Sequence, residues 1–344
     1  MTAPVDSAAA RPLATRLVFL AAVLVVIVLG VLFGTDEASL PHALAGPGMD
    51  RTILFKFRLP RVALAVVAGG GLAVVGAAFQ ALLRNPLAEP YVLGVSGGAA
   101  VGATAAIAAG LSAATIVGAM LVPFSALLGG LLATVVVYGV ARRAPRGPAG
   151  ASILLAGVMV NAIAASLITF GKLVVPPERA AQMLRWLVGF IELPTSRSLL
   201  VVTVYVALGC VYLWLQSGRM NVLALGDEAA EALGVDVGVL EKRVFFAASA
   251  VVGGIVSLTG LIGFVGLVVP HALRRLFGPD HRRLLPLCFL AGAGMLVGCD
   301  LVARLAFDVF STQLPVGAVT AIIGGPLFLI LLTRGSRLGS SGSL

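Results

Sequence analysis

The sequence has few charged residues: Asp, Glu, Lys and Arg make up 11% of its 344 residues, whereas soluble domains carry about 25%. Long apolar runs take their place, and 59% of the residues are hydrophobic. The runs are continuous and do not alternate between apolar and polar residues, so they predict membrane-spanning helices and exclude a β-barrel. The chain is therefore expected to be an all-α membrane protein.

Cysteines, histidines and nucleotide-binding motifs are also scarce, and each shortage excludes a kind of site. Cys210, Cys288 and Cys299 fall in apolar segments without CxxC spacing, so they are interpreted as small core residues. The 3 histidines lie in separate segments and predict no metal site. No Gly-rich loop ends in Lys-Ser or Lys-Thr, and no Ser, His and Asp set is apparent. We expect no catalytic residues and no nucleotide hydrolysis by this chain.

Apolar runs divide the chain into about ten predicted spans within a single transmembrane domain, residues 1–344. The spans are 17–33, 59–83, 91–109, 115–141, 152–170, 199–215, 244–258, 262–277, 284–305 and 316–332. Residues 1–16 are expected to be a cytoplasmic start, 17–334 the helical bundle and 335–344 a flexible tail. The amphipathic stretch 182–189 predicts a short helix at the membrane surface.

Basic residues gather at the ends of these spans and predict the orientation of the chain. Of the 24 Lys and Arg residues, about 15 fall on the side that holds both predicted termini and about 9 on the other. This excess places both termini inside, in the cytoplasm. Arg58, Arg61 and Arg304 stand on the outer side, where the rule disfavours them. They are interpreted as snorkelling anchors, as an i, i+4 pair of Arg304 with Asp300, or as a basic collar for an acidic partner.

A polar segment, residues 219–242, interrupts the apolar pattern between the sixth and seventh spans. Its centre predicts a short helix that Gly226 and Asp227 begin, with Asp227 as the cap, and that Gly234 ends. Such a helix buries too little surface to be stable alone. It is either a solvated connection between two spans or a helix that docks on a soluble subunit. The residues assigned to docking are Gly226, Asp227, Glu228, Ala229, Ala230, Leu233 and Gly234.

The two halves of the chain show a weak internal similarity. Residues 61–77 and 243–260 share a basic start and a Gly-rich apolar run, but the first is predicted to run inward and the second outward. Inverted repeats of this kind are common in transporters. Small residues cluster after each run and permit close packing or broken helices, which indicates segments that move. The clusters are Gly94, Gly97, Gly98 and Gly102 in one half and Gly260, Gly263, Gly266 and Pro270 in the other.

Few charges are predicted in mid-membrane, and Asp300 is the deepest. Proton-coupled carriers usually need buried ionisable chains, so the energy for transport is expected to come from a separate subunit. A path would be lined by mildly polar residues, although each of these also fits ordinary helix packing. The candidates are Gln80, Asn161, Ser166 and Thr169. An ion-coupled secondary carrier is the alternative from another class.

Several segments together resemble the permease subunits of type II ABC importers, which carry ferric siderophores, haem and cobalamin. The resemblance runs in order through most of the chain after residue 50. Its motifs are RLPRVALAVVAGGG, GAAFQALLRNPLAEPYVLGVSGGAAVG, ILLAGV, MNVLALGDEAAEALGV, GLIGFVGLVVPHALRRLFGPDHRRLLP and QLPVGAVTAIIGGP. It implies a homodimer of ten-helix subunits in the bacterial cytoplasmic membrane. It also implies two cytoplasmic ATPase subunits that bind ATP and Mg, no cofactor in this chain, and a periplasmic or lipid-anchored substrate-binding protein.

The resemblance also implies roles for particular residues. The segment 226–234 corresponds to the coupling helix that faces the ATPase, and Arg58, Arg61 and Arg304 correspond to basic positions that meet the binding protein. Asn85 and Leu87 correspond to a cytoplasmic gate. A second gate has small hydroxyl residues in the family, where this chain has Gly150 and Ala151, and Gln313 replaces the usual Glu. An iron chelate is the expected ligand because that group of permeases is larger, and cobalamin is the alternative.

Overall fold

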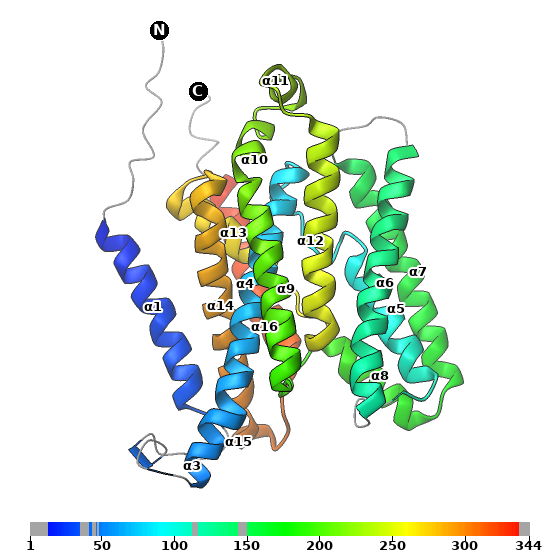
Figure 1. Cartoon of the computed structure of the whole chain (residues 1–344), viewed down its shortest axis with the longest axis vertical. Helices are drawn as coiled ribbons and strands as arrows, with labels where there is room; N and C mark the ends of the chain where they lie inside the picture. The colour runs from blue at the N-terminus through cyan, green and yellow to red at the C-terminus, as the bar shows by residue number, and fades with distance from the viewer. Residues whose placement is uncertain are drawn as a thin grey trace.

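The computed structural model describes residues 13–34, 41–42, 46, 48–111, 116–143 and 150–336, and all regular structure in these residues is helical (Figure 1). Short elements follow α1 and precede α4, and others lie at the two ends of the bundle. In chain order the elements are α1 (Leu13–Leu32), α3 (Met49–Thr52), η1 (Ile53–Arg58), α4 (Leu59–Leu82), α5 (Val95–Ala108), α6 (Ile116–Arg143), α7 (Ala151–Val174), α8 (Pro177–Val188), α9 (Ser196–Leu215), α10 (Ser217–Leu223), α11 (Asp227–Ala232), α12 (Val237–Thr259), α13 (Val265–Phe277), α14 (His281–Leu305), α15 (Phe307–Phe310) and α16 (Val316–Ser336).

Each of the ten predicted spans coincides with one helix, which confirms the all-α membrane fold. The matching helices are α1, α4, α5, α6, α7, α9, α12, α13, α14 and α16. By length and composition, 5 described helices are apolar enough to cross a membrane on their own, counting α4 together with α3 and η1. Most of the predicted start, 1–16, and tail, 335–344, lies outside the described residues.

Helix α4 is the centre of the bundle, and 89% of the most apolar 18-residue stretch of this helical segment is buried. It packs against α14, α12, α13 and α9, whereas α5, α6, α7 and α8 form a group at one side (Figure 1). Its glycines allow this crowding, because a Cβ built on Gly69 would lie 2.3 Å from the carbonyl oxygen of Gly292 on α14. A Cβ on Gly76 would lie 1.9 Å from the carbonyl oxygen of Gly266 on α13. Close backbone contact through small residues is the usual way in which membrane helices associate.

Helices α5 and α13 are short, and both begin after an irregular stretch. With 14 and 13 residues, they are about 20 Å long, less than the roughly 30 Å of a bilayer core. Each starts at a left-handed residue, Gly94 with φ 87° and Phe264 with φ 69°. The preceding helices α4 and α12 run in opposite directions in Figure 1. The arrangement agrees with the inverted similarity and with the glycine clusters seen in the sequence.

Helix α8 lies at the end of the bundle opposite α11, at the bottom of Figure 1. It includes most of the predicted amphipathic stretch and starts five residues earlier, at Pro177, where proline fits the first turn. Met183 is buried, whereas Arg185 is exposed. Gly189, with φ 77°, ends the helix, and a Cβ there would lie 2.1 Å from the carbonyl oxygen of Leu261. This corner therefore holds α8 against the irregular stretch before α13.

The α4–α14 contact gives a direct test of the packing. Gly69→Ala should destabilise the protein by about 1–3 kcal/mol, because the added methyl group has no space at the Gly292 carbonyl. Gly139→Ala on α6 is the matched control, since a Cβ there meets nothing within 4 Å. Thermal unfolding in detergent measures both variants. Equal melting temperatures for the two would contradict the packing described.

Candidate coupling and gate site

Helix α11 forms the outermost part of one end of the bundle, at the top of Figure 1. The predicted cap is wrong: Gly226, with φ 109°, is the N-cap and Asp227 is the first helical residue, with no side-chain capping bond. The predicted end at Gly234 is confirmed by its φ of 81°. The N–H of Gly234 donates to Glu231 O and that of Val235 to Ala230 O, each at 2.9 Å. This pair of bonds is a Schellman closure, which requires a left-handed residue at the position of Gly234.

One face of α11 packs against the rest of this chain, and the other face is exposed to solvent. Ala230 is fully buried against the rest of the protein, so its assignment to contact with a second subunit is corrected. Leu233 is 63% exposed, and Glu228 is also exposed. Leu225, just before the helix, is 67% exposed. The exposed leucines and Glu228 therefore form the surface that is open to a partner.

Asp227 is bound within the chain by Arg84, which follows α4. Nη2 of Arg84 donates to both carboxylate oxygens of Asp227 at 2.8 Å. Glu241, in the first turns of α12, lies near this pair. Burial raises the pKa of the Glu241 carboxyl, Asp227 raises it further, and Arg84 lowers it. The Arg84–Asp227 pair leaves no local pattern in the sequence, because the two residues are 143 positions apart.

Arg84 occupies an unusual backbone position for its residue type. Its φ is 47°, its N–H donates to Ala81 O at 3.3 Å, and that of Asn85 donates to Gln80 O at 3.2 Å. This is the closure seen at the end of α11, where glycine occupies the left-handed position. An L-residue is disfavoured there by about 1–2 kcal/mol, so the turn after α4 holds Arg84 in a strained conformation.

The two predicted gate segments lie together. A Cβ on Gly150, which has φ 74°, would lie 2.6 Å from a methyl carbon of Leu83, the residue before Arg84. In the other segment, Asn85 Oδ1 accepts from the N–H of Leu87 at 2.9 Å. Leu87 and Ala151 are exposed. Any side chain at position 150 would be strained by the φ and would press on Leu83, so glycine suits this backbone position.

A second set of bonds fixes α10 to the start of α14. Asn221 Nδ2 donates to Asp280 Oδ1 at 2.7 Å, and Asn221 Oδ1 accepts from the N–H of His281 at 2.9 Å. Asp280 also caps α14 by accepting from the N–H of Arg282 at 3.0 Å. The hydrogen bond from Asn221 is the main reason that the pKa of Asp280 is below its ordinary value, with smaller lowering by the Arg282 N–H and neighbouring arginines. The segment around α11 is therefore attached to both α4 and α14.

The four predicted path residues have different surroundings. Gln80 is 3% exposed and lies between helices. Its amide donates to Gly266 O at 3.4 Å and accepts from Arg274 at 3.0 Å, so in this structure it is a packing residue. Asn161 and Thr169 line a cavity of about 340 Å³ between α5 and α7. Ser166 and Thr169 are exposed and donate to carbonyls of their own helix.

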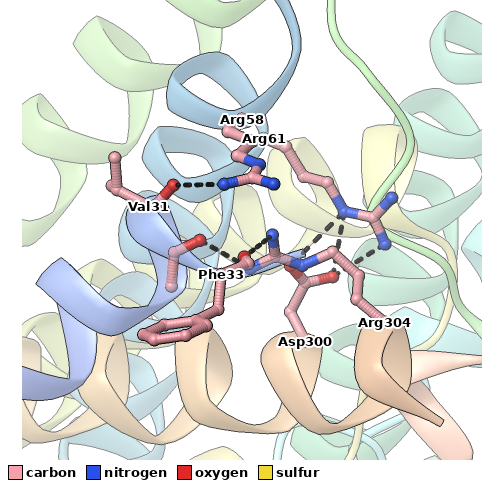
Figure 2. Close-up of polar contacts among 7 residues, drawn as sticks. Val31, Phe33, Arg58, Arg61, Asp300 and Arg304 are labelled. Atoms are coloured by element: carbon pink, nitrogen blue, oxygen red, sulfur yellow. Dashed lines mark hydrogen bonds and ion pairs between the residues drawn. The ribbon is translucent and has the colours of Figure 1, made fainter. Parts of the chain in front are cut away.

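Three arginines and one aspartate form a largely buried cluster (Figure 2). It lies where η1 meets α4, at the end of the bundle opposite α11 (Figure 1). Arg61 Nη2 lies 2.9 Å from Asp300 Oδ1, and Arg304 Nε lies 3.0 Å from Asp300 Oδ2. Arg304 also donates to Phe33 O at 2.9 Å and to Gly30 O at 2.8 Å, and Arg58 donates to Val31 O and Leu32 O. The cluster therefore joins α4 and α14 to the last carbonyls of α1, where a helix favours positive charge.

This cluster corrects the expectation of a basic collar. Arg58 and Arg304 are only 6% and 4% exposed, and Asp300 is 0% exposed. Side chains buried to this degree are not accessible to a docking protein in this structure. The i, i+4 pair of Asp300 and Arg304, one of the alternatives drawn from the sequence, is present. Arg61, which is half-buried, is the most accessible of the three arginines.

The fold defines a class of protein: a polytopic α-helical membrane protein. The chain belongs to the FecCD transport family, whose model matches residues 21–334. It is thus a permease of the type II ABC importer class, an integral membrane transport subunit of the inner membrane. Family membership implies ATPase and substrate-binding partners and replaces the secondary carrier as an interpretation.

Named relatives of this chain carry different ligands. It is 40% identical over 287 residues to the cobalamin import system permease protein BtuC of Halobacterium salinarum, covering 83% of this chain and 74% of that one. It is 36% identical over 282 residues to the hemin transport system permease protein HmuU of Yersinia pestis, covering 82% and 83%. A solved structure described as an inward-facing metal-chelate type ABC transporter matches with a TM-score of 0.82, 29% identity and coverage of 93% and 99%.

The arginine cluster predicts the effect of removing its carboxylate. Asp300→Asn should destabilise the protein by about 3–5 kcal/mol, because the buried arginines lose their ionised partner. Glu192→Gln is the control, since the Glu192–Arg185 pair is exposed on both sides and should change stability by less than about 1 kcal/mol. Thermal unfolding of both variants in detergent measures the difference. A stability of Asp300→Asn equal to that of the control would show that the cluster does not hold α1.

Proposed function

We propose that this chain is the membrane-spanning subunit of an ATP-driven importer for a large metal complex. The single observation that carries the proposal is α11: one face is fixed to this chain through Ala230 and Asp227, while Glu228, Leu225 and Leu233 remain exposed. Exposed leucines beside a charged residue suit a cleft on a soluble subunit. The end that carries α11 is proposed to face the cytoplasm, together with both termini.

The proposed assembly contains two copies of this chain, two ATPase subunits that bind ATP and Mg, and a substrate-binding protein. Helix α7 supports a second copy: only 17% of its most apolar window is buried, and its exposed face carries Ser166 and Thr169 among large apolar side chains. A mixed face of this kind suits a path between two subunits better than a lipid contact. The binding protein is proposed to dock at the opposite end, where Arg61 and exposed arginines such as Arg185 and Arg197 lie.

The proposed mechanism is alternating access. ATP binding closes the two ATPase subunits, and each α11 moves with the subunit on which it docks. Because α11 is bonded to α4 and α10 is bonded to α14, this motion displaces helices as bodies and opens one side while it closes the other. ATP and the loaded binding protein must favour different conformations for such coupling to occur. Asn85 and Leu87, beside Gly150 and Ala151, are proposed to close the cytoplasmic side.

Cobalamin, haem and ferric chelates are all large metal complexes, and this shared chemistry is the proposed ligand class. The 40% identity to a permease named for cobalamin and the 36% identity to one named for hemin differ too little to separate the two. The sequence-based choice of an iron chelate stays a proposal within this class. Transport by the reconstituted complex, measured with each of the three ligands and its cognate binding protein, distinguishes them.

Leu233→Asp tests the proposed surface. The charged side chain should abolish co-purification of the ATPase subunit, because it places a carboxylate in an apolar cleft. Phe310→Asp, an exposed apolar position at the opposite end, is the control and should retain the ATPase. The readout is the ATPase activity of the detergent-solubilised complex after affinity purification. Full retention by Leu233→Asp would refute the assignment of α11.

A second outcome separates this importer from a carrier driven by ion gradients. The reconstituted complex should accumulate ligand in liposomes only when ATP is present on the side of the ATPase subunits. Accumulation driven by a pH or sodium gradient, with an isolated dimer that recruits no ATPase, would overturn the proposed function.

A further inference from the structure

The irregular segment between α4 and α5, residues 84–94, is here called the linker, and it is bonded to three other elements. At its start, Arg84 holds Asp227 of α11 at 2.8 Å. In its middle, Glu89 Oε1 accepts from the N–H of Phe264, the N-cap of α13, at 2.6 Å. Beyond it, the carbonyls of Tyr91 and Val92 accept from Asn161 of α7 at 2.7 and 3.4 Å.

The linker is also braced internally. Besides the bond from Leu87 N–H to Asn85 Oδ1, the N–H of Ala88 donates to Asn85 O and that of Val92 to Glu89 O, each at 3.0 Å. Ala88 and Leu93 are fully buried. A segment held in this way moves as a body, so a displacement at Arg84 is carried to Glu89 and is not absorbed between them.

The strain at Arg84 points to a role for its side chain. Glycine is the usual residue at the left-handed position of a Schellman closure, and this chain uses Gly234 there at the end of α11. Arg84 takes the same position after α4 with φ 47°. The turn itself gains nothing from arginine, whereas the side chain provides the ion pair with Asp227. Strain retained in this way is typical of a functional position.

We infer that the linker transmits the displacement of α11 to the start of α13 and to α7, with Arg84 and Glu89 as the positioning residues at its two attachments. The chain connection from α11 through residues 233–236 moves α12 directly, and the linker adds a path to the short helix that begins inside the bundle. This inference rests on the proposed function, since it requires a partner that moves α11.

Arg84→Gly is the decisive variant, because it removes the side chain and leaves the residue that the turn favours. The complex of permease, ATPase and binding protein in liposomes should retain ATPase co-purification, ATP hydrolysis and thermal stability. Ligand transported per ATP hydrolysed should fall about tenfold, within the usual range of coupling between sites. Arg84→Gln should behave in the same way. Arg219→Gln is the matched control, since Arg219 is an exposed arginine on α10 that bonds to Gln216, and it should transport normally.

Glu89 tests the second attachment. Glu89→Gln keeps an oxygen that accepts from the Phe264 N–H and should retain transport, whereas Glu89→Ala should lower transport per ATP as Arg84→Gly does. The double variant Arg84→Gly with Glu89→Ala should be no worse than the lower of the two single variants, because both break the same connection. If the losses in transport per ATP multiply in the double variant, the two residues act independently, and the inference about the linker is wrong.

A labelling experiment reports the motion directly. Pro86→Cys places a thiol on the exposed part of the linker, and its rate of reaction with a maleimide should change when ATP binds. The change should disappear in the Arg84→Gly background and persist in Arg219→Gln. If the unaltered complex couples ATP to transport while Arg84→Gly keeps both its transport ratio and its labelling change, the inference fails and the proposed function stands. If the unaltered complex recruits no ATPase, the proposed function fails first.

Discussion

Every backbone N–H and C=O inside a membrane must find a partner within the protein, and this constraint shapes the centre of the bundle. Two segments leave the helical conformation there, one before α5 and one before α13. Backbone groups of each segment form hydrogen bonds with the other segment or with a neighbouring helix. Glu89 accepts from Phe264 N–H, and Asn161 donates to the carbonyls of Tyr91 and Val92. The irregular segments are therefore possible only because they meet. The same contact brings together the two halves of the chain, which the sequence shows as a weak inverted similarity.

Close packing around α4 gives this centre its rigidity. Glycines on α4 face the backbone of α14 and α13 without intervening side chains, so these helices move relative to one another only as bodies. Rigid bodies transmit motion only where they are attached. In this protein the attachments at the α11 end include two polar pairs, Arg84 with Asp227 and Asn221 with Asp280, beside the buried apolar contact of Ala230. A bundle of this kind suits a transporter whose energy arrives from outside the membrane.

The sequence predicted the spans, the short helix of the polar segment and its end at Gly234, because long apolar runs and a glycine after a helix are local signals. It predicted the wrong cap for α11 and assigned Ala230 to a partner, because both depend on contacts with distant residues. The burial of Arg58 and Arg304 was missed as well: the pair of Arg304 with Asp300 is a local i, i+4 spacing, whereas the carbonyls of α1 and Arg61 come from far away in the chain. Long-range pairs such as Arg84 with Asp227 leave no pattern in a single sequence.

The arginine cluster has a consequence for the order in which the protein is assembled. Arg61 enters the membrane early in synthesis, with α4, but its carboxylate partner, Asp300, is more than two hundred residues later on α14. Chains generally fold from the N-terminus during synthesis. Most of the chain is therefore made before Asp300 is available to pair with the early arginine. The end of α1, which Arg58 already contacts, gains its remaining bonds when Arg304 arrives on the same helix as Asp300. Insertion of α14 is thus the step that completes the arginine cluster, and a chain that stops before it leaves Arg61 without the carboxylate of Asp300.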